Sequence, residues 1–362
     1  MNPHAAHWRR RLAMLLILGA AVALFTATQF ASTAWINKRQ QLAQQWVHAG
    51  DREAAESHPQ QAVISYRNAL LYNDDSAVRF RMSLAMIAAG DSSEAEAYLL
   101  SLLSEEPGNA DYNLALAHLS QRQKSPSDDK AVSYYRAALL GHWESAPVQH
   151  RVATNLELAR LLLAHRAFTD ARAALLSLTA EMPKDTATQI EIAHLFLQAG
   201  DRHEAAIIAQ QVLKQTPHNG DLRAFYASLL LHSGEFKRAR QEFQLASEHT
   251  SLTPEMQSEY DIARSAETLD PYARGLRVME QSVRLQSILR WLQQRLTMCA
   301  PTSPDLPQAQ QWMQAASVRN LRDHPEAVDQ IVKFAASVEQ TVSACPLRAP
   351  EDAAIQLIGN QQ

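Results

Sequence analysis

Apolar residues recur at helical spacing along most of the chain, and the stretch Thr186–Asn219 shows the pattern in full. Two apolar stripes predict two amphipathic helices. Between the stripes, Gly200-Asp201 can end one helix and cap the next, and Pro217 ends the second, because proline cannot continue a helix. Neither helix can bury its stripe alone, so the unit is expected to pack between copies of itself. The stripes are Ile190, Ile192, Ala193, Phe196 and Leu197, then Ala205, Ile208 and Val212.

The same arrangement returns at strides of thirty-four residues on both sides. Pro183 lies thirty-four positions before Pro217, and Ala239 lies thirty-four positions after Ala205. Counting outward gives six units in register within residues 40–251, which is hard to obtain by chance. The unit at Thr186–Asn219 resembles one complete tetratricopeptide repeat (TPR). The resemblance implies an all-α fold, a right-handed superhelical solenoid of antiparallel helix pairs.

The thirty-four-residue period ends after Pro254, and longer apolar stripes follow. We predict a C-terminal helical domain over residues 252–362 that caps the last repeat, since a terminal repeat otherwise exposes its apolar face. Its longest predicted helix is Tyr272–Met298. We interpret the arginines of this helix as a solvated face, and the alternative is a helix that binds an anionic membrane or an acidic partner. They are Arg274, Arg277, Arg284, Arg290 and Arg295.

Near the N-terminus, the segment Leu12–Ile36 contains no charged residue. A helix of this length spans roughly 37 Å, enough to cross a bilayer core of about 30 Å. Arginines precede the segment, and Trp8 and Trp35 lie at its two ends, where aromatic side chains favour the membrane interface. We predict a transmembrane helix at 12–36, a short cytoplasmic N-terminus at 1–11 and an extracytoplasmic body, which is periplasmic in a Gram-negative cell.

A cleaved signal peptide is the other interpretation of this segment. Leu12 to Phe25 can serve as its apolar core, and Ser32-Thr33-Ala34 as its cleavage site. Both interpretations export the body of the protein.

In a TPR solenoid the first helix of each unit lines the concave face, where partners usually bind. This surface is largely apolar here and suits an amphipathic helix or an extended apolar segment. The Lys, Asn and Arg positions with which chaperone-binding TPR proteins clamp a terminal carboxylate are mostly Ala, Leu and His. Two alternatives are open: the leucines pack between helices, or the C-terminal helices fill the groove. The predicted partner groove is formed by Phe80, Leu84, Ile87, Leu114, His118, Leu156, Arg160, Leu163, Ile190, His194, Leu197 and Leu231.

The chain has two cysteines, Cys299 and Cys345. If the three main helices of the C-terminal domain run up, down and up, both cysteines lie at the same end. Because an exported chain meets an oxidising compartment, we predict a disulfide between them. Two unpaired buried thiols are the alternative.

Composition narrows the function further. Ten glycines among 362 residues suit a nearly all-helical chain, and a net charge of −4 gives no reason to expect a nucleic-acid partner. The sequence contains no HExxH, CxxC, GxGxxG, GxxxxGK[ST] or GxSxG motif. We therefore expect no enzyme activity, no cofactor and no metal.

These observations predict a membrane-anchored extracytoplasmic TPR scaffold. Its partners would be membrane or envelope proteins bound in the concave face. The lipid bilayer would be contacted through residues 12–36, and no nucleic acid is expected. We expect a role in assembling an envelope complex. The alternatives are a structural accessory subunit of a larger integral-membrane complex, and a glycan-binding or envelope polysaccharide factor.

Overall fold

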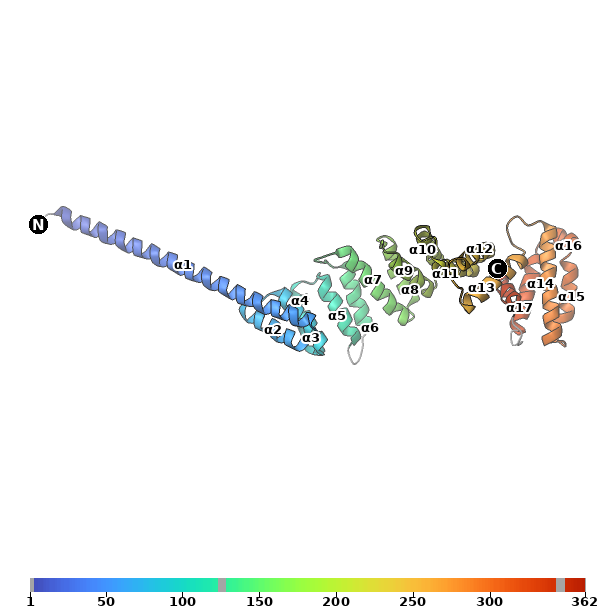
Figure 1. Ribbon diagram of the computed structural model, residues 1–362, viewed down its shortest axis with the longest axis horizontal. Helices are drawn as coiled ribbons and strands as arrows, with labels where there is room; N and C mark the ends of the chain where they lie inside the picture. The colour runs from blue at the N-terminus through green and yellow to red at the C-terminus, as the bar shows by residue number, and fades with distance from the viewer. Residues whose placement is uncertain (1–2, 123–127, 343–348, 362) are drawn as a thin grey trace. The chain divides into compact units, whose positions relative to one another are not determined.

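The computed structural model describes residues 3–122, 128–342 and 349–361, and Figure 1 shows its helices. Side chains are described at Leu18 and from Leu24 onward, apart from residue 128, residues 339–341 and the two gaps. Within these ranges the ordered elements are α-helices and there is no β-strand, which confirms the predicted all-α class. The chain divides into two compact units, unit 1 (Met1–Leu161) and unit 2 (Leu162–Gln362).

Unit 1 is built from consecutive helices that pack in pairs. Their shared core consists of alanines, large aliphatic side chains and Tyr66, with the ring of Phe80 packed at its edge. Small alanines let neighbouring helices approach closely, and the larger side chains fill the space between them. The helices are α1 (Pro3–Ala55), α2 (Pro59–Tyr72), α3 (Ser76–Ala89), α4 (Ser92–Glu105), α5 (Ala110–Arg122), α6 (Asp128–Leu140) and α7 (Pro147–Ala164), the last of which crosses into unit 2.

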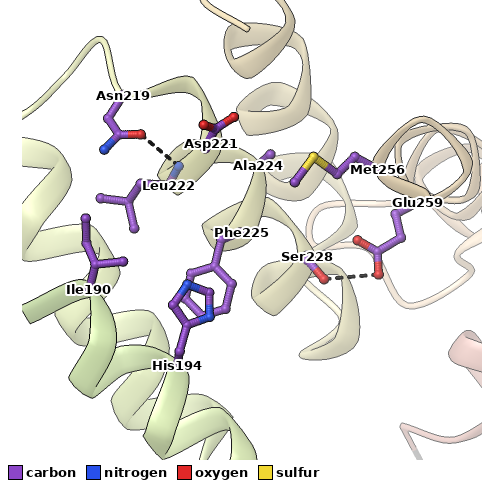
Figure 2. Close-up of a pocket in the computed structure, with 10 residues that line it drawn as sticks. All are labelled: Ile190, His194, Asn219, Asp221, Leu222, Ala224, Phe225, Ser228, Met256 and Glu259. Atoms are coloured by element: carbon purple, nitrogen blue, oxygen red, sulfur yellow. Dashed lines mark hydrogen bonds between the residues drawn. The ribbon is translucent and has the colours of Figure 1, made fainter. Parts of the chain in front are cut away.

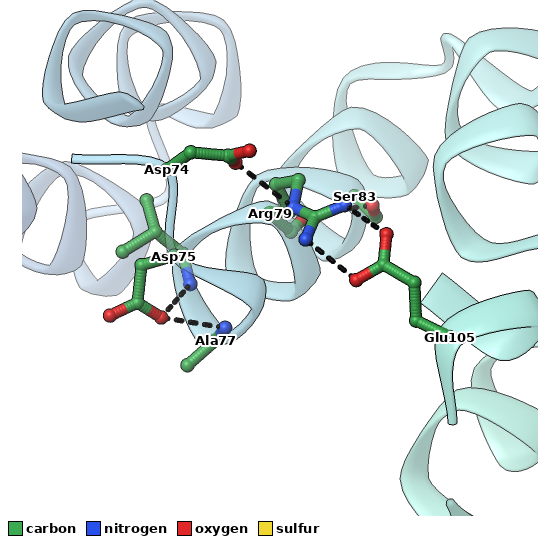
Figure 3. A network of polar contacts seen from close by, with 7 residues as sticks. Asp74, Asp75, Ala77, Arg79, Ser83 and Glu105 are labelled. Atoms are coloured by element: carbon green, nitrogen blue, oxygen red, sulfur yellow. Dashed lines mark hydrogen bonds and ion pairs between the residues drawn. The ribbon is translucent and has the colours of Figure 1, made fainter. Parts of the chain in front are cut away.

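Polar side chains at the start of α3 fix its position against α4, as Figure 3 shows. The carboxylate of Asp75 caps α3 by accepting the backbone N–H groups of Ala77 at 2.8 Å and Val78 at 3.4 Å. Arg79 donates two parallel hydrogen bonds to Glu105 at the end of α4, at 2.7 and 2.8 Å. The bond from Arg79 holds the pKa of Glu105 below its usual range. The paired donors of the guanidinium give this contact a defined geometry.

The N-terminal part of α1 extends away from the other helices of unit 1 (Figure 1). Residues 24–41 are exposed, and burial against α2 begins near Ala43. The exposed large apolar side chains of α1 are Leu18, Leu24, Phe25, Phe30, Trp35, Ile36 and Trp46.

The part of the chain that the structure describes contains no helix that is long and apolar enough to span a bilayer. The side chains of Leu12 to Ile17, in the predicted membrane segment, lie outside the described ones. The transmembrane helix at residues 12–36 therefore stays a prediction.

Unit 2 begins with further helix pairs whose ends lie where the sequence predicts them. Gly200 and Gly234 follow first helices in the left-handed conformation, each with φ of 81°. Asp201 then caps the next helix by accepting the N–H of Glu204 at 3.1 Å. The helices are α8 (Phe168–Thr179), α9 (Thr186–Gln198), α10 (Arg202–Gln215), α11 (Gly220–His232) and α12 (Phe236–Ser247).

The remaining helices of unit 2 pack in an order that differs from the chain order. The last helix, α18, packs against both α13 and α17, and Ser265 on α13 donates a 3.2 Å hydrogen bond to Glu351 on α18. A helix from the end of the chain thus lies beside α13. The helices are α13 (Pro254–Leu269), α14 (Val278–Cys299), α15 (Asp305–Ala315), α16 (Val318–Asp323), α17 (Ala327–Thr341) and α18 (Pro350–Gly359).

The basic helix of this region departs from its predicted solvated face at two residues. Arg284 is half-buried and donates to the backbone carbonyls of Glu267 and Asp270. The side chain of Arg295 is only 3% exposed, and its guanidinium lies 2.9 Å from the carboxylate of Asp352 on α18. Trp291 donates its indole N–H to the same carboxylate at 2.8 Å. Arg295 is buried because it meets this partner from a distant part of the sequence.

Cys299 ends α14, whereas Cys345 lies outside the described residues. The disulfide between them stays a prediction.

Candidate functional site: a pocket on three first helices of unit 2

A pocket of about 420 Å³ lies across α9, α11 and α13. In Figure 2, Ile190 and His194 come from α9, Leu222 and Phe225 from α11, and Met256 from α13. Asn219, Asp221, Ala224, Ser228 and Glu259 complete the lining.

The repeat period accounts for this convergence. Ser228 lies thirty-four positions after His194, Met256 thirty-four after Leu222, and Glu259 thirty-four after Phe225. Equivalent positions of successive repeats face the same side of the array. The side chain of Asn219 caps α11 by accepting the N–H of Leu222 at 3.0 Å, which fixes the first turn of the central helix.

The wall of the pocket is apolar. The rings of His194 and Phe225 lie face to face at a tilt of 38°, with centroids 4.0 Å apart. Burial lowers the pKa of His194 below its usual value, so the imidazole is neutral at pH 7 and acts as part of this wall. Ile190, Phe225 and Met256 are partly buried, which leaves part of each apolar surface open to a ligand.

The rim of the pocket carries two carboxylates. Asp221 accepts a hydrogen bond from the hydroxyl of Thr250 at 3.0 Å. Glu259 accepts one from the hydroxyl of Ser228 at 3.1 Å, and the same oxygen lies 3.3 Å from Nε2 of His232. The pocket therefore combines an apolar wall with an acidic rim.

A second, more polar pocket of about 550 Å³ lies in unit 1. At its centre, Nε2 of His118 lies 2.5 Å from Oε2 of Glu157, and Tyr135 donates a 3.1 Å hydrogen bond to the same oxygen. The hydrogen bond from His118 lowers the pKa of Glu157, although burial raises it. Burial and the neighbouring carboxylate raise the pKa of the Tyr135 phenol. Gln121, Arg122, Arg160 and Leu161 complete the lining.

The structure distributes the twelve predicted groove residues over several environments. Ile190 and His194 line the pocket of unit 2, and His118 and Arg160 line the pocket of unit 1. Leu84 is exposed, and the others that keep some accessible surface are Phe80, Ile87, Leu114, Leu163 and Leu197.

Two of the predicted groove residues are buried in the core instead. Leu156 is 6% exposed and Leu231 is fully buried. The first helix of a repeat has one apolar flank toward the groove and another toward the neighbouring helices. Leu156 and Leu231 lie on the flank toward the neighbouring helices. They cannot contact a partner in this structure.

Sequence reasoning missed Phe225, Met256 and Glu259. The predicted array ends at residue 251, before α13, and therefore leaves out the residues of α13 that continue the period. Counting one more stride from Leu222 and Phe225 would have found Met256 and Glu259.

Over the described ranges, no group of three or more His, Cys, Asp or Glu side chains is placed to hold a metal ion.

Consecutive helix pairs and a pocket formed at equivalent positions define the class of α-helical repeat proteins. Within this class, residues 196–258 match the model of the tetratricopeptide repeat family. Over these residues the chain has the sequence pattern of a tetratricopeptide repeat. The match covers α10, α11 and α12 in full and reaches into α13. The predicted six-repeat array at 40–251, its right-handed superhelix and the capping role of 252–362 stay predictions.

Several solved structures are similar to this chain. One is a tetratricopeptide repeat protein from Parabacteroides merdae ATCC 43184, at 15% identity over 68% of this chain and 92% of that chain, with a TM-score of 0.39. Another is pilF of Pseudomonas aeruginosa, at 20% identity over 65% and 96%, with a TM-score of 0.33. A third is the TPR2AB domain of yeast Sti1 in a pHSP90 complex, at 15% identity over 63% and 95%, with a TM-score of 0.26.

These likenesses are too weak to indicate a particular activity. No curated protein matches the sequence.

Proposed function

We propose that this protein is a non-catalytic scaffold that binds a partner polypeptide through the pocket on α9, α11 and α13. The observation that carries the proposal is an open, largely apolar pocket lined by residues of α9, α11 and α13. First helices of neighbouring repeats lie roughly 10 Å apart, so three of them span about 20 Å. An extended segment of about six residues covers that distance at ~3.3 Å per residue.

The partner would place apolar side chains against Ile190, Phe225 and Met256. Burying one large apolar side chain contributes roughly 1.5–3 kcal/mol. Two or three such side chains suffice for a reversible complex after the cost of ordering the segment.

We further propose that α1 anchors this scaffold at a membrane, with the body on the extracytoplasmic side, and that the scaffold assembles an envelope complex. The absence of charge in Leu12–Ile36 and the exposure of Phe25, Phe30 and Trp35 support this proposal. A lipid bilayer would cover these side chains. A structural accessory subunit of a larger membrane complex would cover them with neighbouring helices instead.

Affinity purification from native membranes, followed by mass spectrometry, tests the scaffold. The informative variant is Met256→Glu, which places a charge in the apolar wall. The matched control is Leu245→Glu, since Leu245 is 39% exposed on α12 and does not line the pocket. We expect Met256→Glu to lose the captured partner and Leu245→Glu to retain it, with equal helicity by circular dichroism.

Retention of the partner by Met256→Glu would refute binding through this pocket. A stoichiometric set of membrane subunits that both variants retain would instead identify an accessory subunit. Loss of capture on adding soluble envelope glycan would favour the glycan-binding alternative.

A further inference from the structure

The carboxylates at the rim of the unit 2 pocket favour a partner segment that carries positive charge. We propose that this pocket binds an extended segment with apolar side chains flanked by lysine or arginine. This inference rests on the proposed function, because it names the chemistry of the partner at the same site.

The first argument is the composition of the lining. Of the ten described residues around the pocket, Asp221 and Glu259 carry carboxylates and none is lysine or arginine. His194 adds no positive charge at pH 7, because burial lowers its pKa. The field inside the pocket is therefore negative, and an acidic segment would be repelled.

The second argument is how the carboxylates of unit 2 are satisfied. Two carboxylates away from the pocket are neutralised by arginines of the same chain: Glu242 lies 2.5 Å from Arg223, and Glu267 lies 2.5 Å from Arg240. The rim carboxylates have different neighbours. Neutral hydroxyls, those of Thr250 and Ser228, donate to Asp221 and Glu259, and Glu259 also contacts the imidazole of His232. Hydroxyl donors orient a carboxylate without neutralising it, so its charge is available to a cationic partner group.

The third argument is the placement of the two carboxylates. Asp221 lies in the first turn of α11, and Glu259 lies on the next first helix, α13. In Figure 2 the side chains of Ala224 and Met256 lie between these two carboxylates. A segment lying across the wall would thus carry basic residues beside its apolar core. Such a ligand is the opposite of the terminal carboxylate that a Lys- and Arg-lined TPR groove clamps.

Fluorescence anisotropy with three synthetic peptides tests this specificity on the full-length protein in mild detergent. The peptides are Lys-Leu-Phe-Leu-Lys, Ser-Leu-Phe-Leu-Ser and Glu-Leu-Phe-Leu-Glu, each blocked at both ends and labelled with the same dye. We expect the basic peptide to bind about tenfold more tightly than the neutral one, because each partly exposed ion pair adds a modest gain. The acidic peptide should bind most weakly, and the preference should shrink at 0.5 M salt, where screening is strong.

The variant Asp221→Asn/Glu259→Gln removes both rim charges and keeps the side-chain shapes. We expect it to bind the basic and neutral peptides equally. The charge-matched control is Glu248→Gln/Asp261→Asn, at positions just after α12 and on α13 that do not line the pocket, and it should keep the wild-type preference.

The outcomes separate this inference from the proposed function. If all three peptides bind equally and Met256→Glu abolishes their binding, the pocket binds polypeptides and the charge preference is refuted. Tighter binding of the acidic peptide would likewise overturn the preference. If no peptide binds, and Met256→Glu retains the partner from native membranes, both the pocket and its specificity are refuted.

Discussion

At the residue scale, two glycines offer a matched comparison. Gly200 and Gly234 share a φ of 81°, but a Cβ at Gly200 meets nothing within 4 Å, whereas at Gly234 it meets the side chain of Gln361. The left-handed conformation costs a residue with a Cβ roughly 1–2 kcal/mol. Gly200→Ala should lower the free energy of unfolding by that amount. Gly234→Ala should lower it only slightly more, because the exposed end of the Gln361 side chain can move aside.

Chemical denaturation followed by circular dichroism measures both variants. The double variant Gly234→Ala/Gln361→Ala removes the steric contact and should bring the loss back to the Gly200→Ala value. If Gly234→Ala unfolds as easily as the double variant, the contact with Gln361 has no energetic weight.

The buried ion pair of unit 2 gives a second residue-scale prediction. Arg295 and Asp352 have side chains 3% and 11% exposed. Asp352→Asn removes the negative charge beside the buried guanidinium, which costs up to roughly 3–5 kcal/mol. Thermal and urea unfolding should show this loss. The control is Asp261→Asn, whose contact with Arg264 is exposed and is worth less than about 1 kcal/mol. Equal effects of the two variants would contradict a buried pair.

Glu157 predicts a pH dependence of stability in unit 1. The hydrogen bond from His118 lowers its pKa in the folded state, and Tyr135 and Arg160 act in the same direction. When folding lowers the pKa of a carboxyl group, its ionised form stabilises the folded protein at any pH above the unfolded pKa of about 4.3. This stabilisation is lost as the pH falls through the folded pKa.

The variant Glu157→Gln should therefore be less stable than the wild type at pH 5.5, by up to about 1 kcal/mol for this partly exposed group. The difference should shrink as the pH falls below the unfolded value and through the lowered folded pKa of Glu157. Urea titrations at a series of pH values measure it, with Glu94→Gln on the exposed surface of α4 as the control. A constant difference across this range would show that Glu157 acts through packing and not through its charge.

At the element scale, the predictable part of the fold is the part that local pattern controls. The stop at Gly200-Asp201 and the cap at Asn219 follow from residues within one helical turn. The docking of α18 against α13 has no such local signal, because it joins segments far apart in the sequence. The burial of Arg295 was missed for the same reason, since its partner Asp352 belongs to α18.

The lining of the pocket also could not be predicted from local pattern alone. A helical period places Ile190 and Leu231 on apolar stripes alike, but it does not distinguish the flank toward the groove from the flank toward a neighbouring helix. The structure leaves Ile190 accessible and buries Leu231 completely.

Removing α18 tests its role as a packing element. A chain ended after residue 348 should expose the faces of α13 and α17 that pack against α18. Hydrogen exchange read by mass spectrometry should show faster exchange in α13 and α17, because local protection follows packing. The helices α3 and α5 of unit 1 serve as internal controls and should keep their wild-type rates. Unchanged protection in α13 would mean that α18 is dispensable for it.

At the scale of the whole molecule, the open question is what covers the exposed apolar side chains of α1. We expect the full-length protein to sediment with membranes and to resist extraction by alkaline carbonate, because a bilayer covers Phe25, Phe30 and Trp35. A variant lacking residues 3–36 should move to the soluble fraction and keep its helicity. The control carries Leu140→Glu, since Leu140 is 91% exposed on α6, and it should sediment like the wild type.

Intact-mass measurement of the purified protein separates the two interpretations of the N-terminal segment. An uncleaved anchor keeps all residues of Leu12–Ile36, whereas a signal peptide cut after Ala34 leaves a chain that begins at Trp35. Such a cut would remove Phe25 and Phe30 and release the scaffold from the bilayer. A full-length chain in the soluble fraction would refute both membrane anchoring and cleavage, and a second protein would then be required to cover α1.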